Sequence, residues 1–363
     1  MAATPTMMFG EKSYSPVKEK SARGLILIVT IMLLRIRQLM LQMGSRVRGH
    51  VFFSCILLGI LFFFVAFRIG FQIGAAGDVD LGVVGLLTSS DSSASSSSRT
   101  RYTVLINTWK RYSLLKQTVA HYASCRRVDA VHVVWSESDP PPDSLKNILT
   151  RLVESKSYNT GNKVNFRFNV NEENNLNNRF KPIKDLTNDA IFSIDDDVIV
   201  PCDTLDFAFS VWQSAPDAMV GFVPRMHWPV KGKDGVTYYN YGGWWSIWWT
   251  GTYSMVLSKA AFFHRKYLDL YTYNMPSSIH EYVLRERNCE DIAMSLLVSN
   301  ATGASPIWVK GKLYEIGSSG ISSLKGHSER RSKCVNDFVS LYGTMPLVPT
   351  NLKAIDARGE WFW

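Results

Sequence analysis

The chain has 363 residues, of which 46% are hydrophobic, so it is long enough for one large domain with a buried core and for additional segments. Its net charge is +9, but residues 1–50 hold eight Lys/Arg and two Glu, which leaves only +3 for the rest. The sequence has no basic stripe with interleaved aromatic residues, which argues against a nucleic-acid partner.

The first structural signal along the chain is the uncharged run VFFSCILLGILFFFVAF at residues 51–67. It is hydrophobic on every side and, extended by residues 69–77, is long enough for a hydrocarbon core of about 30 Å. It lies too far from the N-terminus for an ordinary removable signal peptide and lacks a small-residue cleavage site. We therefore predict a retained single-pass anchor at 51–75. The Lys/Arg excess before it makes residues 1–50 a cytosolic tail and sends the C-terminal part into the lumen.

A serine-rich segment follows the predicted anchor. The run TSSDSSASSSS at Thr88–Ser98 is poor in apolar residues, so residues 76–100 are predicted to form a flexible stem before a luminal domain at 101–363. Cys55 falls inside the anchor, and the other four cysteines could form disulfides in an oxidising lumen, with three possible pairings. These are Cys125, Cys202, Cys289 and Cys334. The sequon at Asn300 predicts N-glycosylation.

The luminal part alternates strand-like and helix-like segments. The predicted elements are a strand at 102–109, a helix at 112–122, a strand at 131–135, a helix at 143–153, and strands at 163–170 and 190–194. Strands separated by helices predict an α/β domain with a largely parallel sheet. Ligands bind such sheets beyond the carboxyl ends of the strands.

Three consecutive carboxylates, Asp195, Asp196 and Asp197, stand at such a strand end in the run FSIDDDVIV. Along extended backbone the first and third side chains face one way and the middle one the other. A divalent cation between the triplet and a diphosphate would explain them, because Mg²⁺ and Mn²⁺ commonly bind one or two carboxylates together with substrate phosphates. The competing interpretation is a solvated acidic turn.

Two further clusters contain charged residues. In RNCEDIAMSLLV, Glu290 and Asp291 stand at a predicted helix start, where negative charge is favourable with or without a catalytic role. In GSSGISSLKGHSERRSKC, at 317–334, a Gly/Ser loop leads into several Lys/Arg that could bind phosphates. This segment matches no phosphate-loop motif, so a solvated basic loop is an equally good interpretation.

Aromatic residues are concentrated in YYNYGGWWSIWWTGTY at Tyr238–Tyr253. Such rings can form a platform for a sugar or seat against a membrane surface. Ordinary core packing is the alternative, because Trp is usually highly buried.

Five motifs in order along the chain, NTWKR, NNLNNRF, SIDDD, NRNCEDIAM and HSERRSKC, resemble glycosyltransferase family 64, the family of the exostosin-like enzymes. The resemblance covers about residues 101–363. The segments WKRYSLLKQTVAHYASC, NNRFKPIKDL, GGWWSIWW and the terminal WFW are most similar to its plant branch. The resemblance implies a GT-A fold, a sugar-nucleotide donor, Mn²⁺ and retention of the anomeric configuration.

The same motifs imply roles for individual residues. Asp291 is implied as the catalytic carboxylate beside the anomeric carbon, and a disulfide is implied between Cys289 and Cys334. Asp197 is implied as the principal metal ligand, assisted by Asp195. The residues implied to bind the donor are Arg111, Asn174, Arg179, Asp195, Asp196, Glu290 and Arg331, with Arg331 near the diphosphate.

This chain also departs from the animal members of the family. They have two asparagines where it has Ser136-Glu137, and Asp where it has Glu290. These changes fit a donor change from a UDP-sugar to GDP-mannose. The resemblance thus implies a Golgi membrane enzyme, single-pass with a luminal catalytic domain, that transfers mannose from GDP-mannose to the head group of glycosylinositol phosphorylceramide in the membrane. The alternatives are a UDP-N-acetylhexosamine-dependent transferase and a noncatalytic luminal lectin.

Overall fold

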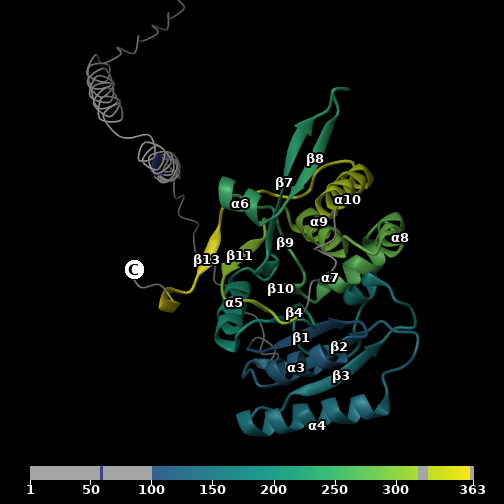
Figure 1. Ribbon diagram of the computed structural model, residues 1–363, viewed down its shortest axis with the longest axis vertical. Coiled ribbons are helices and arrows are strands. Elements are labelled where there is room, and N and C mark those ends of the chain that lie inside the picture. The colour runs from purple at the N-terminus through teal and green to yellow at the C-terminus, as the bar shows by residue number, and fades with distance from the viewer. Residues whose placement is uncertain (1–57, 60–99, 318–325, 360–363) are drawn as a thin grey trace, which may run out of the picture. The chain divides into compact units, whose positions relative to one another are not determined.

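The computed structural model describes residues 58–59, 100–317 and 326–359 (Figure 1). The predicted tail, nearly all of the predicted anchor and nearly all of the stem lie outside these ranges. Within them, no helix combines the length and the apolar character needed to cross a membrane. The fold below is that of the described residues from Thr100 onward.

An eight-stranded sheet forms the centre of the domain, in the order β13-β11-β6-β10-β4-β1-β2-β3 (Figure 1). Within this sheet β10 alone runs against the other strands, because it pairs antiparallel with both β4 and β6. The strands are β1 (Tyr102–Thr108), β2 (Val128–Trp135), β3 (Asn165–Val170), β4 (Ala190–Asp195), β6 (Val220–Gly221), β10 (Ala260–His264), β11 (Ile307–Lys310) and β13 (Lys353–Ile355). The predicted α/β fold with a largely parallel sheet is confirmed, and the antiparallel β10 makes it a mixed sheet.

Two smaller sheets adjoin the main one. A two-stranded sheet pairs β5 (Val198–Ile199) with β12 (Tyr314–Glu315) directly after the acidic triplet. A three-stranded sheet combines β7 (Pro224–Lys231), β8 (Thr237–Gly242) and β9 (Met255–Val256). Its β7–β8 hairpin extends away from the rest of the domain (Figure 1).

Each face of the main sheet has its own apolar core, because successive side chains along a strand point to opposite faces. Val104 and Ile106 of β1 pack with α3 (Tyr112–Ala123), α4 (Asp143–Thr160) and α5 (Cys202–Ser214). Leu105, between them, belongs to the core on the opposite face. The helices on that side are α7 (Lys266–Asp269), η2 (Leu270–Asn274), α8 (Ser277–Glu286), α9 (Glu290–Thr302) and α10 (His327–Tyr342).

The six elements predicted before the acidic triplet are all present, with small shifts at their ends. The largest shift is in α4, which continues to Thr160 and ends at Gly161, whose φ of 65° suits a glycine at a helix C-terminus. The remaining short elements are η1 (Leu176–Phe180), α6 (Trp244–Thr250) and η4 (Ala357–Gly359).

Two disulfides connect elements that are distant in sequence. Cys289 is joined to Cys334, the pair that the resemblance implies, and this bond ties the start of α9 to α10. The other bond joins Cys125 to Cys202. Of the three pairings open from the sequence, the structure therefore has the one that the family resemblance favours.

Candidate active site

The carboxyl ends of neighbouring parallel strands bring the candidate residues together at one edge of the sheet. In the register of β1 and β4, Asn107 lies opposite Asp195, and Thr108 lies opposite Trp135 of β2. Asp195 is therefore at the same edge as Arg111, which follows β1, and Glu137, which follows β2. This is the edge at which α/β sheets bind their ligands.

The three carboxylates of the triplet differ in exposure. The side chains of Asp195 and Asp197 are 25% and 19% exposed, whereas that of Asp196 is fully buried. The three side chains alternate in exposure as predicted, but extended backbone is not the cause. Strand β4 ends at Asp195, and the next two residues form a turn. A solvated acidic turn is excluded for Asp196.

Asp196 is held by hydrogen bonds inside the domain. Thr108 Oγ1 donates to its carboxylate at 2.6 Å, and Thr118 Oγ1 donates to its backbone carbonyl at 2.6 Å. Burial raises the pKa of the Asp196 carboxyl to about 6, although the Thr108 hydrogen bond and the charge of Arg111 lower it. Asp196 therefore holds the turn in place, and Asp195 and Asp197 are the carboxylates of the triplet that can contact a ligand.

Two arginines form ion pairs with the triplet and offset part of its negative charge. Arg111 contacts the carboxylates of both Asp196 and Asp197, with 2.6 Å between its Nη1 and Asp197 Oδ2. The almost fully buried Arg179 contacts Asp195 and donates to Ser258 Oγ at 3.3 Å. Guanidinium groups also bind phosphates, so both are placed to exchange a carboxylate contact for a donor phosphate or sugar.

The two partly exposed carboxylates could hold a divalent cation. Asp195 and Asp197 offer accessible oxygens, which suit Mn²⁺ when substrate phosphates and water complete the coordination. Gly317 approaches Asp197 so closely that a Cβ at position 317 would lie 2.8 Å from the Asp197 Cβ. Ile316 N also donates to the Asp197 carbonyl at 2.7 Å. The start of the Gly/Ser loop therefore fixes the backbone of Asp197.

A second cluster of side chains has the spacing of metal ligands, but its ligand atoms already have other partners. Among the described residues, His121, Cys125 and Cys202 place ligand atoms within 4.8 Å of one another. The two sulfur atoms form a disulfide, and His121 Nε2 lies 2.8 Å from the Val200 carbonyl oxygen. This group is a structural crosslink, and the acidic triplet remains the candidate metal site.

The second part of the site is a buried ion pair at the start of α9. Asp291, in the first turn of this helix, contacts Arg331 through both carboxylate oxygens. Both residues are almost fully buried, and the Arg331 guanidinium carbon lies 5.0 Å from the ring centroid of Tyr241. In the structure Arg331 therefore contacts Asp291. Its implied place near the donor diphosphate stays a prediction.

Glu290 precedes Asp291 and is partly buried. Burial, followed by the negative charge of Asp291, raises the pKa of Glu290, while Arg179 and Arg331 lower it. Arg179 therefore links the two halves of the site, because it pairs with Asp195 and its charge also acts on Glu290.

The remaining predicted residues are Asn174, for donor binding, and Asn300, for glycosylation. Asn174 is partly buried in the segment between β3 and η1 (Leu176–Phe180), five residues before Arg179. Asn300 is exposed in the last turn of α9, where an attached glycan would meet solvent. Its glycosylation stays a prediction.

Glu137 is a site residue that the sequence motifs did not identify. It is buried, and its carboxylate accepts hydrogen bonds from Lys110 N at 2.9 Å and from Tyr112 Oη at 2.8 Å. These are the two residues that flank Arg111, and Lys110 has a left-handed φ of 57°. Glu137 thus positions Arg111. The signals in the sequence were an acidic residue two positions after a strand and the departure from the animal members at Ser136-Glu137.

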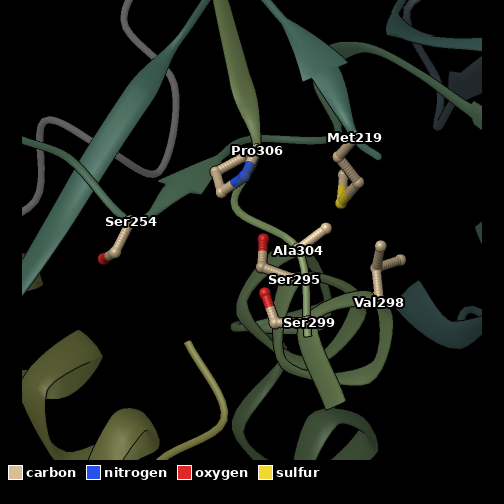
Figure 2. Close-up of a pocket in the computed structure, with 7 residues that line it drawn as sticks. All are labelled: Met219, Ser254, Ser295, Val298, Ser299, Ala304 and Pro306. Atoms are coloured by element: carbon tan, nitrogen blue, oxygen red, sulfur yellow. The ribbon is translucent and has the colours of Figure 1, made fainter. Parts of the chain in front are cut away.

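A small cavity lies beneath α9 (Figure 2). Its volume is about 10 Å³, and the serines among its lining residues are Ser254, Ser295 and Ser299. This space is close to that of a single water molecule. Ser295 Oγ donates to the Asp291 carbonyl at 2.9 Å, so the cavity lies against α9, and it is too small for a sugar nucleotide.

Sequence comparisons identify the family to which the chain belongs. The glycosyl transferase family 64 domain matches residues 102–359. The chain is 63% identical to glycosylinositol phosphorylceramide mannosyl transferase 1 of Arabidopsis thaliana over 74% of its own length and 80% of that protein. It is 33% identical to human exostosin-like 2 over 69% of its length and 76% of that protein.

One solved structure also matches over a large part of the chain. It is a mannosyltransferase from Pyrobaculum calidifontis in complex with GDP-Man and Mn²⁺, and the match covers 67% of this chain and 64% of that one. The identity is 15% and the TM-score is 0.40, which is too low for an argument about this chain. The extent of the family match and the two relatives are sufficient by themselves: the chain belongs to glycosyltransferase family 64.

Proposed function

We propose that this protein transfers mannose from GDP-mannose to the head group of glycosylinositol phosphorylceramide, with retention of the anomeric configuration and in a GT-A fold. The observation that carries the proposal is the 63% identity over 80% of the Arabidopsis mannosyl transferase of that name. The site supports it, because partly exposed carboxylates, arginines and a buried carboxylate at a helix start are the groups that sugar-nucleotide chemistry needs.

Asp197 and Asp195 would hold Mn²⁺, which acts as a Lewis acid and stabilises the leaving diphosphate when it is bound. Arg111 and Arg179 already contact these carboxylates, so their positive charges lie where donor phosphates would bind. Glu137 keeps the Arg111 backbone in place through the residues on either side of it. Donor binding therefore depends on this side of the site.

Asp291 would stabilise the positive charge that develops at the anomeric carbon. A retaining enzyme can use such a carboxylate electrostatically or as a nucleophile that forms a glycosyl-enzyme. Both oxygens of Asp291 contact Arg331, which reduces the electron density available for covalent attack. In the electrostatic role the transfer takes place on one face of the sugar, and the departing phosphate takes the proton of the acceptor hydroxyl.

We propose a Golgi location with the catalytic domain in the lumen. The apolar run at 51–67 would be a single-pass anchor, the basic residues before it would remain in the cytosol, and the serine-rich stem would connect the anchor to the domain. Two disulfides and an exposed sequon at Asn300 suit an oxidising, glycosylating compartment.

The full-length protein, purified in detergent, can be tested with Mn²⁺ and a panel of GDP- and UDP-sugars on glycosylinositol phosphorylceramide that lacks mannose. Mass spectrometry should detect one added hexose with GDP-mannose alone, and NMR should show the α-anomer of the donor retained. Transfer of N-acetylhexosamine from a UDP-sugar would replace the proposed donor with the alternative. If no donor is consumed while the glycolipid binds, the protein is a lectin.

A further inference from the structure

The short helix α6, with the sequence WWSIWWT, turns four tryptophans towards solvent. Ile247 points inward and is buried, whereas the tryptophans are 40–78% exposed, with Trp245 at the upper limit and Trp248 at the lower. Tryptophan is usually highly buried, and contiguous exposed apolar surface in a soluble domain marks an interaction site. The core interpretation of this aromatic stretch therefore holds for Tyr241, Ile247 and Tyr253 but not for the tryptophans.

The geometry of the rings argues against a platform for a single sugar. The Trp245 and Trp248 rings are inclined at 80°, with centroids 6.2 Å apart, and the Trp248 and Trp249 rings are inclined at 44°. A sugar stacks on one flat, accessible ring face, whereas here neighbouring rings present edges and faces in turn. This arrangement forms an irregular apolar surface instead of a binding groove.

Basic side chains lie beside this surface. Trp244 packs edge-on against Trp308 of β11 with 5.6 Å between ring centroids, and Lys353 Nζ lies 4.3 Å from the centroid of the Trp308 ring. Lys310 ends the same strand and is exposed. Tryptophan prefers the water–hydrocarbon boundary of a bilayer, and lysine is attracted to the anionic phosphates there. The combination fits a lipid surface better than an apolar protein partner.

The helix is also close in sequence and space to the reaction centre. It begins three residues after Tyr241, whose ring packs against Arg331, the partner of Asp291. The link is tight, because a Cβ at Gly242 would lie 2.5 Å from the Trp228 ring. A surface bound by α6 would therefore be next to the side of the site that contains Asp291.

We propose that α6 docks the catalytic domain on an anionic phospholipid bilayer, with Trp245 and Trp248 inserted at the interface, so that a lipid acceptor reaches Asp291 without leaving the membrane. The role in acceptor delivery rests on the proposed function, but the docking itself does not. In Figure 1, α6 lies beside β13, while α4 is at the opposite end of the domain.

The test uses the full-length protein reconstituted in vesicles of phosphatidylserine and brominated phosphatidylcholine, in which bromine quenches nearby tryptophans. Wild type should be quenched strongly, and a Trp245→Ser/Trp248→Ser variant should lose most of that quenching. Tyr158→Ser is the matched control, because Tyr158 is an aromatic side chain on α4 that is 87% exposed. It should leave the quenching unchanged. Equal quenching in wild type and the double variant would overturn the proposal and point to a protein partner.

A second measurement separates acceptor delivery from mannosyl transfer. The double variant should raise the KM for glycolipid in vesicles by about 10-fold while its GDP-mannose hydrolysis stays normal, and Trp245→Phe/Trp248→Phe should restore the KM, since Phe keeps the apolar ring. Unchanged KM in the Ser variant would refute delivery. If no nucleotide sugar is used but the quenching difference is present, the proposed function fails and the docking stands.

Discussion

Arg331 contacts both carboxylate oxygens of Asp291, and the two side chains come from helices joined by the Cys289–Cys334 disulfide. Both residues are almost fully buried, so each charge depends on the other for compensation. Loss of one member of such a pair leaves an uncompensated buried charge, while loss of both is much less costly.

Stability and activity should therefore separate at this pair. Arg331→Gln alone, or Asp291→Asn alone, should lower the free energy of unfolding by about 3 kcal/mol. The double variant should recover much of that loss and still lack activity, because the carboxylate is absent. Urea unfolding of the three variants measures the coupling. Strictly additive losses would show that the two charges do not depend on each other.

The metal site can be tested at Asp197. Asp197→Asn keeps the shape of the side chain but removes its charge, so Mn²⁺-dependent binding of GDP-mannose should weaken by at least about 10-fold, and turnover should fall as well. Asp269→Asn, an exposed carboxylate on α7, is the control and should bind normally. Calorimetry that finds the same Mn²⁺-dependent affinity in Asp197→Asn and wild type would exclude Asp197 as the ligand.

Glu137→Gln tests the positioning of Arg111. The amide can accept from only one of the two donors, Lys110 N and Tyr112 Oη, so the turn that carries Arg111 should loosen. We expect the Kd for GDP-mannose to rise about 10-fold, with a smaller change in kcat. Tyr112→Phe should reproduce part of this effect, and Glu154→Gln on the exposed surface of α4 should have none. A purely structural role would lower thermal stability without changing donor affinity.

His132 should make stability depend on pH. Burial lowers its pKa from 6.5 to about 4, so between these values the unfolded state binds a proton that the folded state does not. The contribution of neutral, buried His132 to the free energy of unfolding is therefore fully present above the unfolded pKa. It is lost as the pH drops towards the folded pKa. From about pH 7 to about pH 5 the loss should be about 2 kcal/mol.

His132→Gln isolates this contribution, because other groups titrate equally in both proteins. The difference in unfolding free energy between wild type and variant should shift by about 2 kcal/mol across that pH range. His227 is a second buried histidine whose pKa burial lowers to about 4, so the variant should keep part of the acid sensitivity. A difference that does not vary with pH would show that His132 is not neutral and buried in solution.

Much of the sheet could be predicted, because β1, β2 and β4 are short, mostly buried segments rich in apolar and β-branched residues. The two-residue strands β6 and β9 carry too little periodicity to be identified, and their pairing depends on contacts far along the chain. The place of the triplet at the end of a strand could be predicted because that motif is local. The Arg331–Asp291 pair joins residues 40 positions apart, and no local pattern indicates that partnership.

The role of Glu137 could not be predicted from the sequence for a similar reason. A carboxylate shortly after a strand can be noticed in the sequence. Its partners, Lys110 and Tyr112, follow β1 and lie 27 and 25 positions away, and the pairing of β1 with β2 brings them together. The four tryptophans of α6 show that composition indicates an aromatic cluster without telling which rings face the core. Exposure depends on the helix phase, which the single buried Ile247 sets.

Asp291 is proposed to stabilise the transition state of mannosyl transfer. Its most direct test is single-turnover kinetics of folded Asp291→Asn, with the GDP-mannose and Mn²⁺ affinities measured on the same preparation. We predict that turnover falls by about 100-fold or more, with donor and metal binding nearly intact, as for the loss of one transition-state stabiliser. Near-normal turnover in the folded variant, or a defect that lies entirely in donor affinity, would contradict the claim.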